Sequence, residues 1–429
     1  MALPNPVIVV PGITATYLVD EYPLPPEVIW KVLGGSKDFV RSALHPDSLR
    51  YELKEPARVQ PGQIYEVAYR ELIEELRHNL TPVEDQPVPV FPFSYDWRLP
   101  LDASEGELSL FVVEVIERTL LLKHYYGDAE FRENPKVNLV GHSMGGLIIA
   151  GYLKRAGEMA PVGKVVSLAS PFRGSLEPVL KITTGMADLG TGAAGSRDRE
   201  AARLTPALYQ LLPSFAGALV TRGNAPGDLL KPDAWQPGLI NTLTDFIKLH
   251  GRSPKNPREK AERLFSAILQ QAREHRMRLE NFSLNDAGLG DDDWLCVVGI
   301  GAKTRMYIES KLDQSGNVEF EINSSQRFNE GTKTGDGTVP LPGALPAFVP
   351  ANKVVCIDPD DYGYWEIQDK AMTKIAGFHG ILPNMNMLHR MIVRFFTGAD
   401  NKHGNTWGRV LPGIDKAEWD PPLDLGESQ

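Results

Sequence analysis

The sequence predicts a doubly wound α/β fold, in which helices cover both faces of a mostly parallel sheet. Short β-branched runs at residues 7–10, 137–140 and 164–168 are typical of strands that are buried on both faces. Residues 65–80 and 108–127 space their apolar side chains as amphipathic helices do. Strands that alternate with helices at this spacing indicate a parallel sheet.

The 429 residues are expected to form one elaborated domain. The predicted division is a first part of the core at residues 1–175 with an insertion at 17–53, a cap at 176–290, a second part of the core at 291–399, and a C-terminal tail at 400–429. The cap is predicted because its residues are Gly-rich, then charged and helical, without a clear strand. The polar tail is expected to lie over the surface or to be disordered.

Further elements are expected along the chain. They are a helix over residues 25–33 that packs on the core, with a lipid-touching element as the alternative; a strand running into a loop at 88–98; a strand at 294–301; a hairpin at 306–322; a strand at 354–357; and a helix near 387–396. Residues 183–198 are rich in Gly, Ala and Ser, which is typical of a segment that is easily ordered or released. They are expected to form part of a lid that can cover Ser143, with a surface loop far from the site as the alternative.

Charge and composition exclude several classes of protein. The net charge of −10 and the sequence pI of about 5.5 argue against a nucleic-acid partner and against long-range attraction to anionic membranes, so any contact with a lipid interface is expected to be local, apolar and transient. Cys296 and Cys356 lie in apolar runs and are expected to be free, buried thiols. The first residues lack a basic segment followed by a long apolar run, and no later segment reaches transmembrane length, so the cytoplasm is the expected location.

Residues Gly141 to Gly145 read GHSMG, which matches the G-x-S-x-G nucleophile elbow of α/β-hydrolases. A β-branched strand precedes this motif and a small-residue helix start follows it, as the elbow requires. The flanking glycines permit a strained strand-to-helix turn that exposes the Ser143 hydroxyl. Ser143 is therefore the candidate nucleophile.

A serine hydroxyl needs a base within hydrogen-bond reach, and the base needs an acid that fixes its tautomer. In this fold the order along the chain is Ser, Asp or Glu, His. Asp336 lies in the Gly-flanked segment GDGTVP and is the candidate acid, with Asp361 as the alternative. His379 precedes the last amphipathic helix and is the candidate base, whereas its rival His389 falls inside that helix.

The tetrahedral intermediate of ester cleavage needs two donors aimed at its oxyanion. In this fold one donor is the backbone N–H of the residue after the nucleophile, which is Met144 here. The second should come from a loop that follows an early strand. Ile13 is assigned this role because it follows Gly12, where the backbone can approach the site closely.

The chain resembles the lecithin:cholesterol acyltransferase family, which includes lysosomal phospholipase A2 and phospholipid:diacylglycerol acyltransferases. The matching segments, in the family's order, are PVIVVPG, FSYDWRLP, GHSMGG, SLASPFRGS, LYQLLPS, GDGTVP and FHGILPNMNM. The resemblance implies Ser143, Asp336 and His379 as the catalytic triad, with oxyanion donors on Ile13 and Met144. Within YDWR, Asp96 and Arg98 are expected to pair, and Trp97 is expected to pack near the acyl groove.

The chain departs from the family's common pattern because residues 17–53 contain no cysteine and no signal peptide precedes them, which puts lipoprotein or lysosomal roles in doubt. The expected function is that of a serine esterase, lipase, phospholipase or O-acyltransferase that acts on lipid esters through an acyl-enzyme. A non-lipid ester as substrate and a non-catalytic lipid- or partner-binding homologue are the alternatives. No cofactor or metal is expected, since the acidic groups at 291–293 and 358–361 lack the spacing of a Ca²⁺ loop.

Overall fold

The structure is a computed structural model of the 429-residue chain. It describes residues 3–31, 39–44, 59–185, 196–321 and 334–427. The proposed lid segment falls mostly outside the described residues, as does much of the insertion predicted at 17–53.

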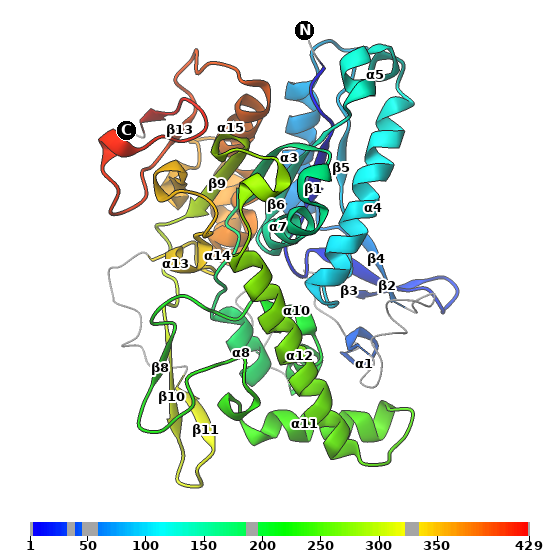
Figure 1. The fold of residues 1–429 in the computed structure, drawn as a ribbon, viewed down its shortest axis with the longest axis vertical. Helices are drawn as coiled ribbons and strands as arrows, with labels where there is room; N and C mark the ends of the chain where they lie inside the picture. Colours follow the sequence, from blue (N-terminus) through cyan, green and yellow to red (C-terminus); the bar gives the residue numbers. More distant parts are fainter. Residues whose placement is uncertain (1–2, 32–38, 45–58, 186–195, 322–333, 428–429) are drawn as a thin grey trace.

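The centre of the fold is a six-stranded sheet with the order β12-β9-β7-β6-β1-β5 (Figure 1). Its strands are β1 (Val7–Val10), β5 (Val90–Pro92), β6 (Val137–His142), β7 (Val162–Leu168), β9 (Trp294–Gly299) and β12 (Val355–Ile357). Each neighbouring pair in this sheet is parallel. The predicted α/β fold with a parallel sheet is confirmed.

Alternation along β1 explains why both faces of the sheet carry helices. Ile8 and Val10 belong to a hydrophobic cluster with helices α4 (Leu101–Leu120) and α7 (Met144–Ala156). Val7 and Val9 face the opposite way and belong to a second cluster, with α3 (Glu66–Leu80) and α15 (Asn386–Thr397). Because successive side chains of a strand point to opposite faces, a strand that is apolar at every position requires a helix layer on each side.

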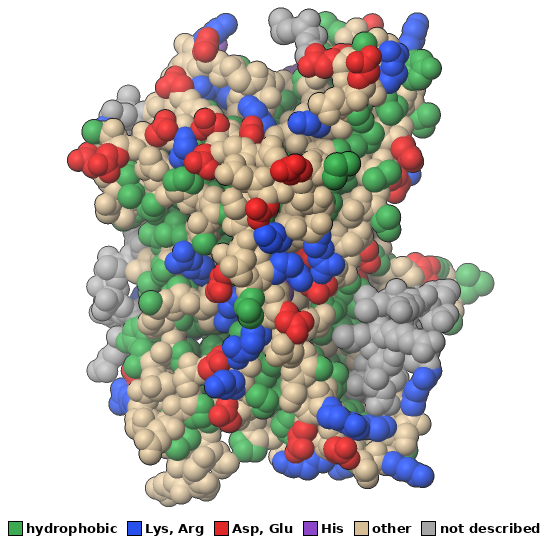
Figure 2. All heavy atoms as spheres, viewed as in Figure 1, with side chains coloured by type: hydrophobic (Ala, Val, Ile, Leu, Met, Phe, Trp, Pro, Cys, Tyr) green, Lys and Arg blue, Asp and Glu red, His purple; other side chains and the backbone are tan. Residues whose placement is uncertain are grey.

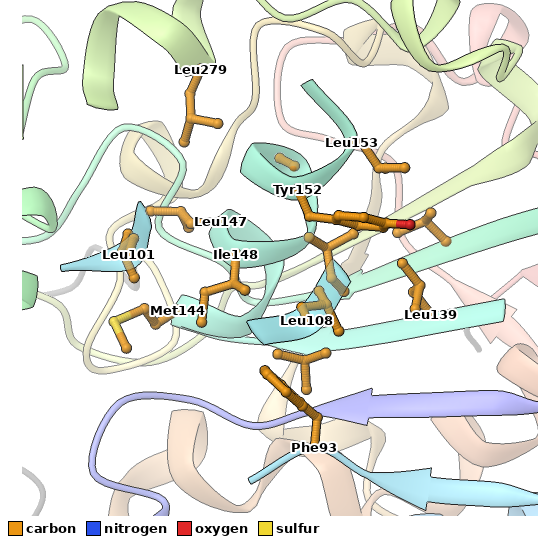
Figure 3. Packing of buried hydrophobic residues seen from close by; sticks show 14 of the residues in the cluster. Phe93, Leu101, Leu108, Leu139, Met144, Leu147, Ile148, Tyr152, Leu153 and Leu279 are labelled. Carbon is orange, nitrogen blue, oxygen red and sulfur yellow. The ribbon is translucent and has the colours of Figure 1, made fainter. Parts of the chain in front are cut away.

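Helix α7 is the central helix of the first layer. Its side chains pack against Leu101 and Leu108 of α4 and against Leu139 of β6, as Figure 3 shows. Ten consecutive residues of α7, from Met144 to Leu153, are buried, so this helix has no solvent-exposed face over most of its length. A helix that is apolar all round is stable only in the interior of a fold.

The segment predicted as a cap forms a helical body with its own hydrophobic core. It contains α8 (Glu177–Thr184), α9 (Ser196–Arg203), α10 (Pro206–Gln210), α11 (Pro237–His250) and α12 (Pro257–Glu280). The expectation of no strand in this segment was wrong, because β8 (Leu219–Thr221) pairs with β10 (Ile308–Leu312). The pairing partner lies about 90 residues downstream, so this three-residue strand depends on a tertiary contact that the local pattern does not reveal.

The predicted hairpin is confirmed, with β10 and β11 (Val318–Glu321) paired antiparallel. It extends the small sheet of β8 and packs in the hydrophobic core of the cap segment.

The helix expected over residues 25–33 is wrong. Residues Glu27–Trp30 form β3, which pairs antiparallel with β2 (Thr16–Asp20), and β2 pairs in turn with β4 (Val59–Ile64). Val28, Ile29 and Trp30 are residue types that favour strands, and β2 supplies the ladder that the local pattern does not reveal. The short helix α1 (Phe39–Ser42) follows, and residues 32–38 and 45–58 lie outside the described part.

A buried charge cluster joins the cap to the core. The Glu105 carboxylate of α4 has no exposed side-chain surface and lies 3.0 Å from His275 Nε2 and 3.2 Å from the Arg278 guanidinium, both on α12. Arg155 at the end of α7 contacts the same carboxylate at 2.6 Å. Gly151 of α7 makes room for this carboxylate, since a Cβ there would lie 2.0 Å from Glu105 Oε1.

The C-terminal residues that the structure describes pack against the core. Backbone bonds join Arg409 to Cys356 at the edge strand β12, and β13 (Trp407–Gly408) pairs with β14 (Gly426–Glu427). The structure also describes the α-helices α5 (Lys123–Gly127), α6 (Ala129–Glu133), α13 (Leu341–Ala344) and α14 (Ile367–Ile381).

Surface and interior agree with the composition. Acidic and basic side chains are interspersed over the face that carries α12 (Figure 2). Within the described ranges, no helix is long and apolar enough to cross a membrane. Cys296 and Cys356 are free and buried, as predicted, and burial raises the pKa of each thiol to about 12.

Replacing Leu153 by Ala tests the packing of α7. Leu153 is 0% exposed, so we expect a loss of about 2–5 kcal/mol in the free energy of unfolding, from lost burial and from the cavity that remains. Leu121→Ala is the matched control, because Leu121 is 84% exposed and its change should stay within about 0.5 kcal/mol. Urea unfolding with an unchanged slope checks both values, and equal midpoints for the two variants would contradict the packing described.

Candidate functional site

Ser143 occupies the turn between β6 and α7, with backbone angles φ 53° and ψ −126°. Few residues other than glycine adopt a positive φ, so this turn is strained and depends on its surroundings. Gly141 and Gly145 make it possible. A Cβ on Gly141 would lie 2.7 Å from the backbone nitrogen of Gly146, and one on Gly145 would lie 2.2 Å from the carbonyl oxygen of Val10.

The structure brings together the three residues predicted as nucleophile, base and acid. His379 Nε2 lies 2.9 Å from Ser143 Oγ, and His379 Nδ1 lies 2.6 Å from Asp336 Oδ2. All three residues are at most 7% exposed. A buried serine, imidazole and carboxylate in this order have the geometry for proton transfer from the hydroxyl to the ring.

The loop of Asp336 explains the sequence GDGTVP. One oxygen of the carboxylate accepts the backbone N–H groups of Thr338 and Val339, which leaves the other oxygen for His379. Gly337 has a positive φ of 97°. A Cβ on Gly335 would lie 2.3 Å from the Val339 carbonyl oxygen, so the loop closes too tightly for any other residue there.

His379 lies near the end of α14, ahead of the amphipathic helix α15. The helix is broken at Gly377, whose φ of 74° and ψ of 162° are not helical, and His379 belongs to the turn that follows. Its backbone N–H donates to the Asp336 carbonyl oxygen at 3.1 Å. Asp336 therefore holds this residue through both the main chain and the side chain.

The alternative base and acid lie elsewhere. His389 is buried inside α15, and its Nε2 contacts the Pro383 carbonyl oxygen at 2.7 Å. Asp361 accepts hydrogen bonds from Arg409 and from the Trp407 indole. Neither residue is positioned beside Ser143, so geometry favours His379 and Asp336.

The two residues predicted as oxyanion donors flank Ser143. Met144 is the first residue of α7, and amides of a first helical turn have no carbonyl partner within the helix. Ile13 follows β1 and lines the same cavity as Ser143. A Cβ on Gly12 would lie 2.9 Å from the Ser143 Cβ, so the backbone of this loop passes directly beside the serine.

Two buried residues beside the site were not identified from the sequence. Tyr69 of α3 lies 2.7 Å from His142 Nδ1, and His142 Nε2 lies 3.0 Å from the His379 carbonyl oxygen. Burial and the neighbouring His379 lower the pKa of His142 well below its ordinary value. The available signals were weak, namely a hydroxyl-bearing aromatic on the buried stripe of a helix and a histidine in the elbow itself.

A cavity of about 120 Å³ opens at Ser143. Its lining is largely apolar and includes Ile13, Trp30, Trp97, Ala202, Leu208 and Leu211. The indole N–H groups of Trp30 and Trp97 donate to the Thr14 and Thr16 carbonyl oxygens, which leaves the rings to form an apolar wall. Trp97 thus lines the cavity, and residues of the cap segment line it as well.

The Asp96 and Arg98 side chains pair as predicted. Two bonds of 2.9 and 2.6 Å join the guanidinium to the carboxylate, and a third of 3.1 Å reaches the Ser42 carbonyl oxygen beside the cavity. This pair fixes the loop that carries Trp97. In the described ranges, no group of three or more His, Cys, Asp or Glu residues is arranged to hold a metal ion.

The chain is similar to known proteins in sequence and in fold. The family model "Lecithin:cholesterol acyltransferase" matches residues 62–250, while comparison with curated proteins found no match. Among solved structures, the Tle4–Tli4 complex matches with a TM-score of 0.59 and 16% identity, over 93% of this chain and 100% of that chain. At this identity the likeness shows the fold alone.

Two further solved structures have lower TM-scores. The lipase BlEst2 from Bacillus licheniformis has 0.36 at 10% identity, over 92% of this chain and 93% of that chain. The phospholipase PlaB from Legionella pneumophila has 0.31 at 10% identity, over 79% of this chain and 45% of that chain. The fold is that of an α/β-hydrolase, and the resemblance to the lecithin:cholesterol acyltransferase family that the motifs predicted is confirmed over residues 62–250.

Proposed function

We propose that this protein cleaves lipid esters through an acyl-enzyme on Ser143 and passes the acyl group to water or to an alcohol. The observation that carries the proposal is the pair of contacts at His379, 2.9 Å to Ser143 Oγ and 2.6 Å to Asp336 Oδ2. The family match supports an ester hydrolase or acyltransferase acting on lipids at a general level.

In the proposed reaction, Ser143 Oγ attacks the ester carbonyl carbon while its proton passes to His379 Nε2. Asp336 accepts the Nδ1–H and stabilises the imidazolium that forms. The backbone N–H groups of Ile13 and Met144 donate hydrogen bonds that stabilise the negative charge on the former carbonyl oxygen. Collapse of the intermediate breaks the ester C–O bond, and His379 returns its proton to the departing alcohol.

The second half of the reaction repeats these steps with an acceptor. Water or an alcohol attacks the acyl-serine carbonyl and gives its proton to His379, and Ser143 Oγ leaves with that proton. The products are a carboxylic acid in the first case and a new ester in the second. Mass spectrometry of products, after incubation with mixed phospholipids and a long-chain alcohol, separates hydrolysis from acyl transfer.

Lipid esters are the proposed substrates because the cavity at Ser143 is lined mainly by apolar side chains, with two tryptophan rings on one wall. An acyl chain transferred from water to such a lining gains about 25 cal/mol per Å² of apolar surface buried. A small polar ester gains little from it. The alternative of a non-lipid ester predicts instead the highest kcat/KM for short or aromatic acyl groups.

Ser143→Ala should abolish ester turnover and reaction with a fluorophosphonate probe, because Oγ supplies the covalent bond. Ser104→Ala is the matched control, since Ser104 is a buried serine in α4 whose Oγ has no hydrogen-bond partner among the described residues. The control should react like the natural protein. Peptide mass spectrometry locates the adduct, and an adduct on any other residue would contradict the assignment of the nucleophile.

Asp336→Asn should lower kcat on the order of thousands-fold, because a neutral amide no longer holds the required histidine tautomer. The two backbone N–H groups that Asp336 accepts should still support the loop, so the thermal unfolding midpoint should change far less than the activity. Asp361→Asn provides the comparison. Near-normal turnover in the Asp336 variant, with loss in the Asp361 variant, would reverse the assignment of the acid.

Ala202→Phe should separate long acyl chains from short ones. Ala202 lines the cavity and is buried, so a phenyl ring there occupies space that the proposed acyl chain needs. We expect kcat/KM for a palmitoyl ester to fall at least about tenfold, while an acetyl ester is turned over nearly as before. Equal losses for both esters would indicate damage to the site rather than a filled acyl pocket.

A further inference from the structure

A continuous hydrogen-bonded chain runs beneath the site from the loop after β1 to the backbone of His379. Gly12 N–H donates to Tyr69 Oη at 2.9 Å, Tyr69 Oη lies 2.7 Å from His142 Nδ1, and His142 Nε2 lies 3.0 Å from the His379 carbonyl oxygen. The Tyr69 and His142 side chains are buried, at 1% and 4% exposed. The proposed steps of ester cleavage use neither side chain.

The partners fix the direction of every bond in this chain. The His379 carbonyl oxygen can only accept, so His142 Nε2 carries a proton and donates it. A neutral ring then has a bare Nδ1, which accepts the Tyr69 O–H, and Tyr69 Oη accepts the Gly12 N–H. The lowered pKa of His142 agrees with a neutral ring.

The two ends of this hydrogen-bonded chain lie at the groups whose small displacements would affect the proposed reaction most. Gly12 precedes Ile13, the proposed oxyanion donor, and its backbone passes beside Ser143. At the other end, His379 lies two residues after the break at Gly377, so the helix alone does not fix its backbone. Its N–H is held by the Asp336 carbonyl oxygen and its C=O by His142.

We propose that Tyr69 and His142 are positioning residues that hold the oxyanion loop and the general base in one fixed relation to Ser143. This inference rests on the proposed function. Without the Tyr69 hydroxyl, the Gly12 N–H is buried without its acceptor, and His142 Nδ1 loses its hydrogen-bond donor. The Gly12–Ile13 loop and His379 then sample positions that stabilise the transition state less well. The apolar cavity that is proposed to bind the acyl chain is unchanged.

Tyr69→Phe tests the inference, because it removes only the hydroxyl. Tyr125→Phe is the matched control, since Tyr125 is also fully buried and its Oη donates to the carbonyl oxygen of Pro4 at 2.7 Å. Each rate on a soluble short-chain ester is normalised to the concentration of active sites. That concentration is the amount of Ser143 labelled when the reaction with a fluorophosphonate is complete. We expect Tyr69→Phe to lower kcat on the order of tenfold to a hundredfold with KM within about twofold, and Tyr125→Phe to change neither.

A second readout distinguishes positioning from a general loss of stability. A trifluoromethyl ketone forms a tetrahedral adduct with an active serine, so its affinity should fall in Tyr69→Phe by about the same factor as kcat/KM. His142→Gln and His142→Leu form a further pair. The Gln amide retains an N–H that can reach the His379 carbonyl oxygen, so this variant should keep more activity than the Leu variant, which fills the space but cannot donate.

The outcomes separate the inference from the function on which it rests. If Tyr69→Phe keeps the kcat/KM and ketone affinity of the natural protein per labelled serine, or if the two His142 variants lose activity equally, the positioning role is overturned. If the natural protein neither labels at Ser143 nor turns over esters, the proposed function itself fails and this inference fails with it.

Discussion

The contact between His379 Nε2 and Ser143 Oγ is the interaction on which the rest of the site depends, and it joins residues 236 positions apart. The parallel sheet makes it possible, because the carboxyl ends of parallel strands meet at one edge. The Gly12–Ile13 loop follows β1, Ser143 follows β6, and Asp336 packs against Gly299 at the end of β9. The chemistry is therefore assembled from loops that share one edge of the sheet.

Glycine residues allow the loops to approach one another closely at that edge of the sheet. A Cβ on Gly12 would lie 2.9 Å from the Ser143 Cβ, and one on Gly299 would lie 2.5 Å from the Asp336 Cβ. The positive φ of Ser143 is tolerated for the same reason, since Gly145 lets the start of α7 lie against the backbone at the end of β1. These contacts leave no room for a side chain at Gly12, Gly145 or Gly299.

Much of this could be predicted because the motifs combine local geometry with chemistry: a strained turn requires GHSMG, and a tight carboxylate loop requires GDGTVP. What failed depended on distant partners. Val28 and Trp30 become part of a strand through β2, and residues 219–221 become one through β10, neither of which local periodicity reveals. Tyr69 and His142 were missed because their roles arise from contacts between α3, the elbow and α14.

The helix that begins directly after Ser143 also contacts the cap. Helix α7 runs from Met144 to Ala156, and Arg155 near its end shares the Glu105 carboxylate with His275 and Arg278 of α12. A buried carboxylate is costly without its partners, so separating α12 from the core would expose or isolate charge. The cap residues that line the cavity come instead from α8 to Leu211. Helix α12 therefore joins the cap to the core through buried charge, whereas α8 to α10 supply the cap side chains that line the cavity at Ser143.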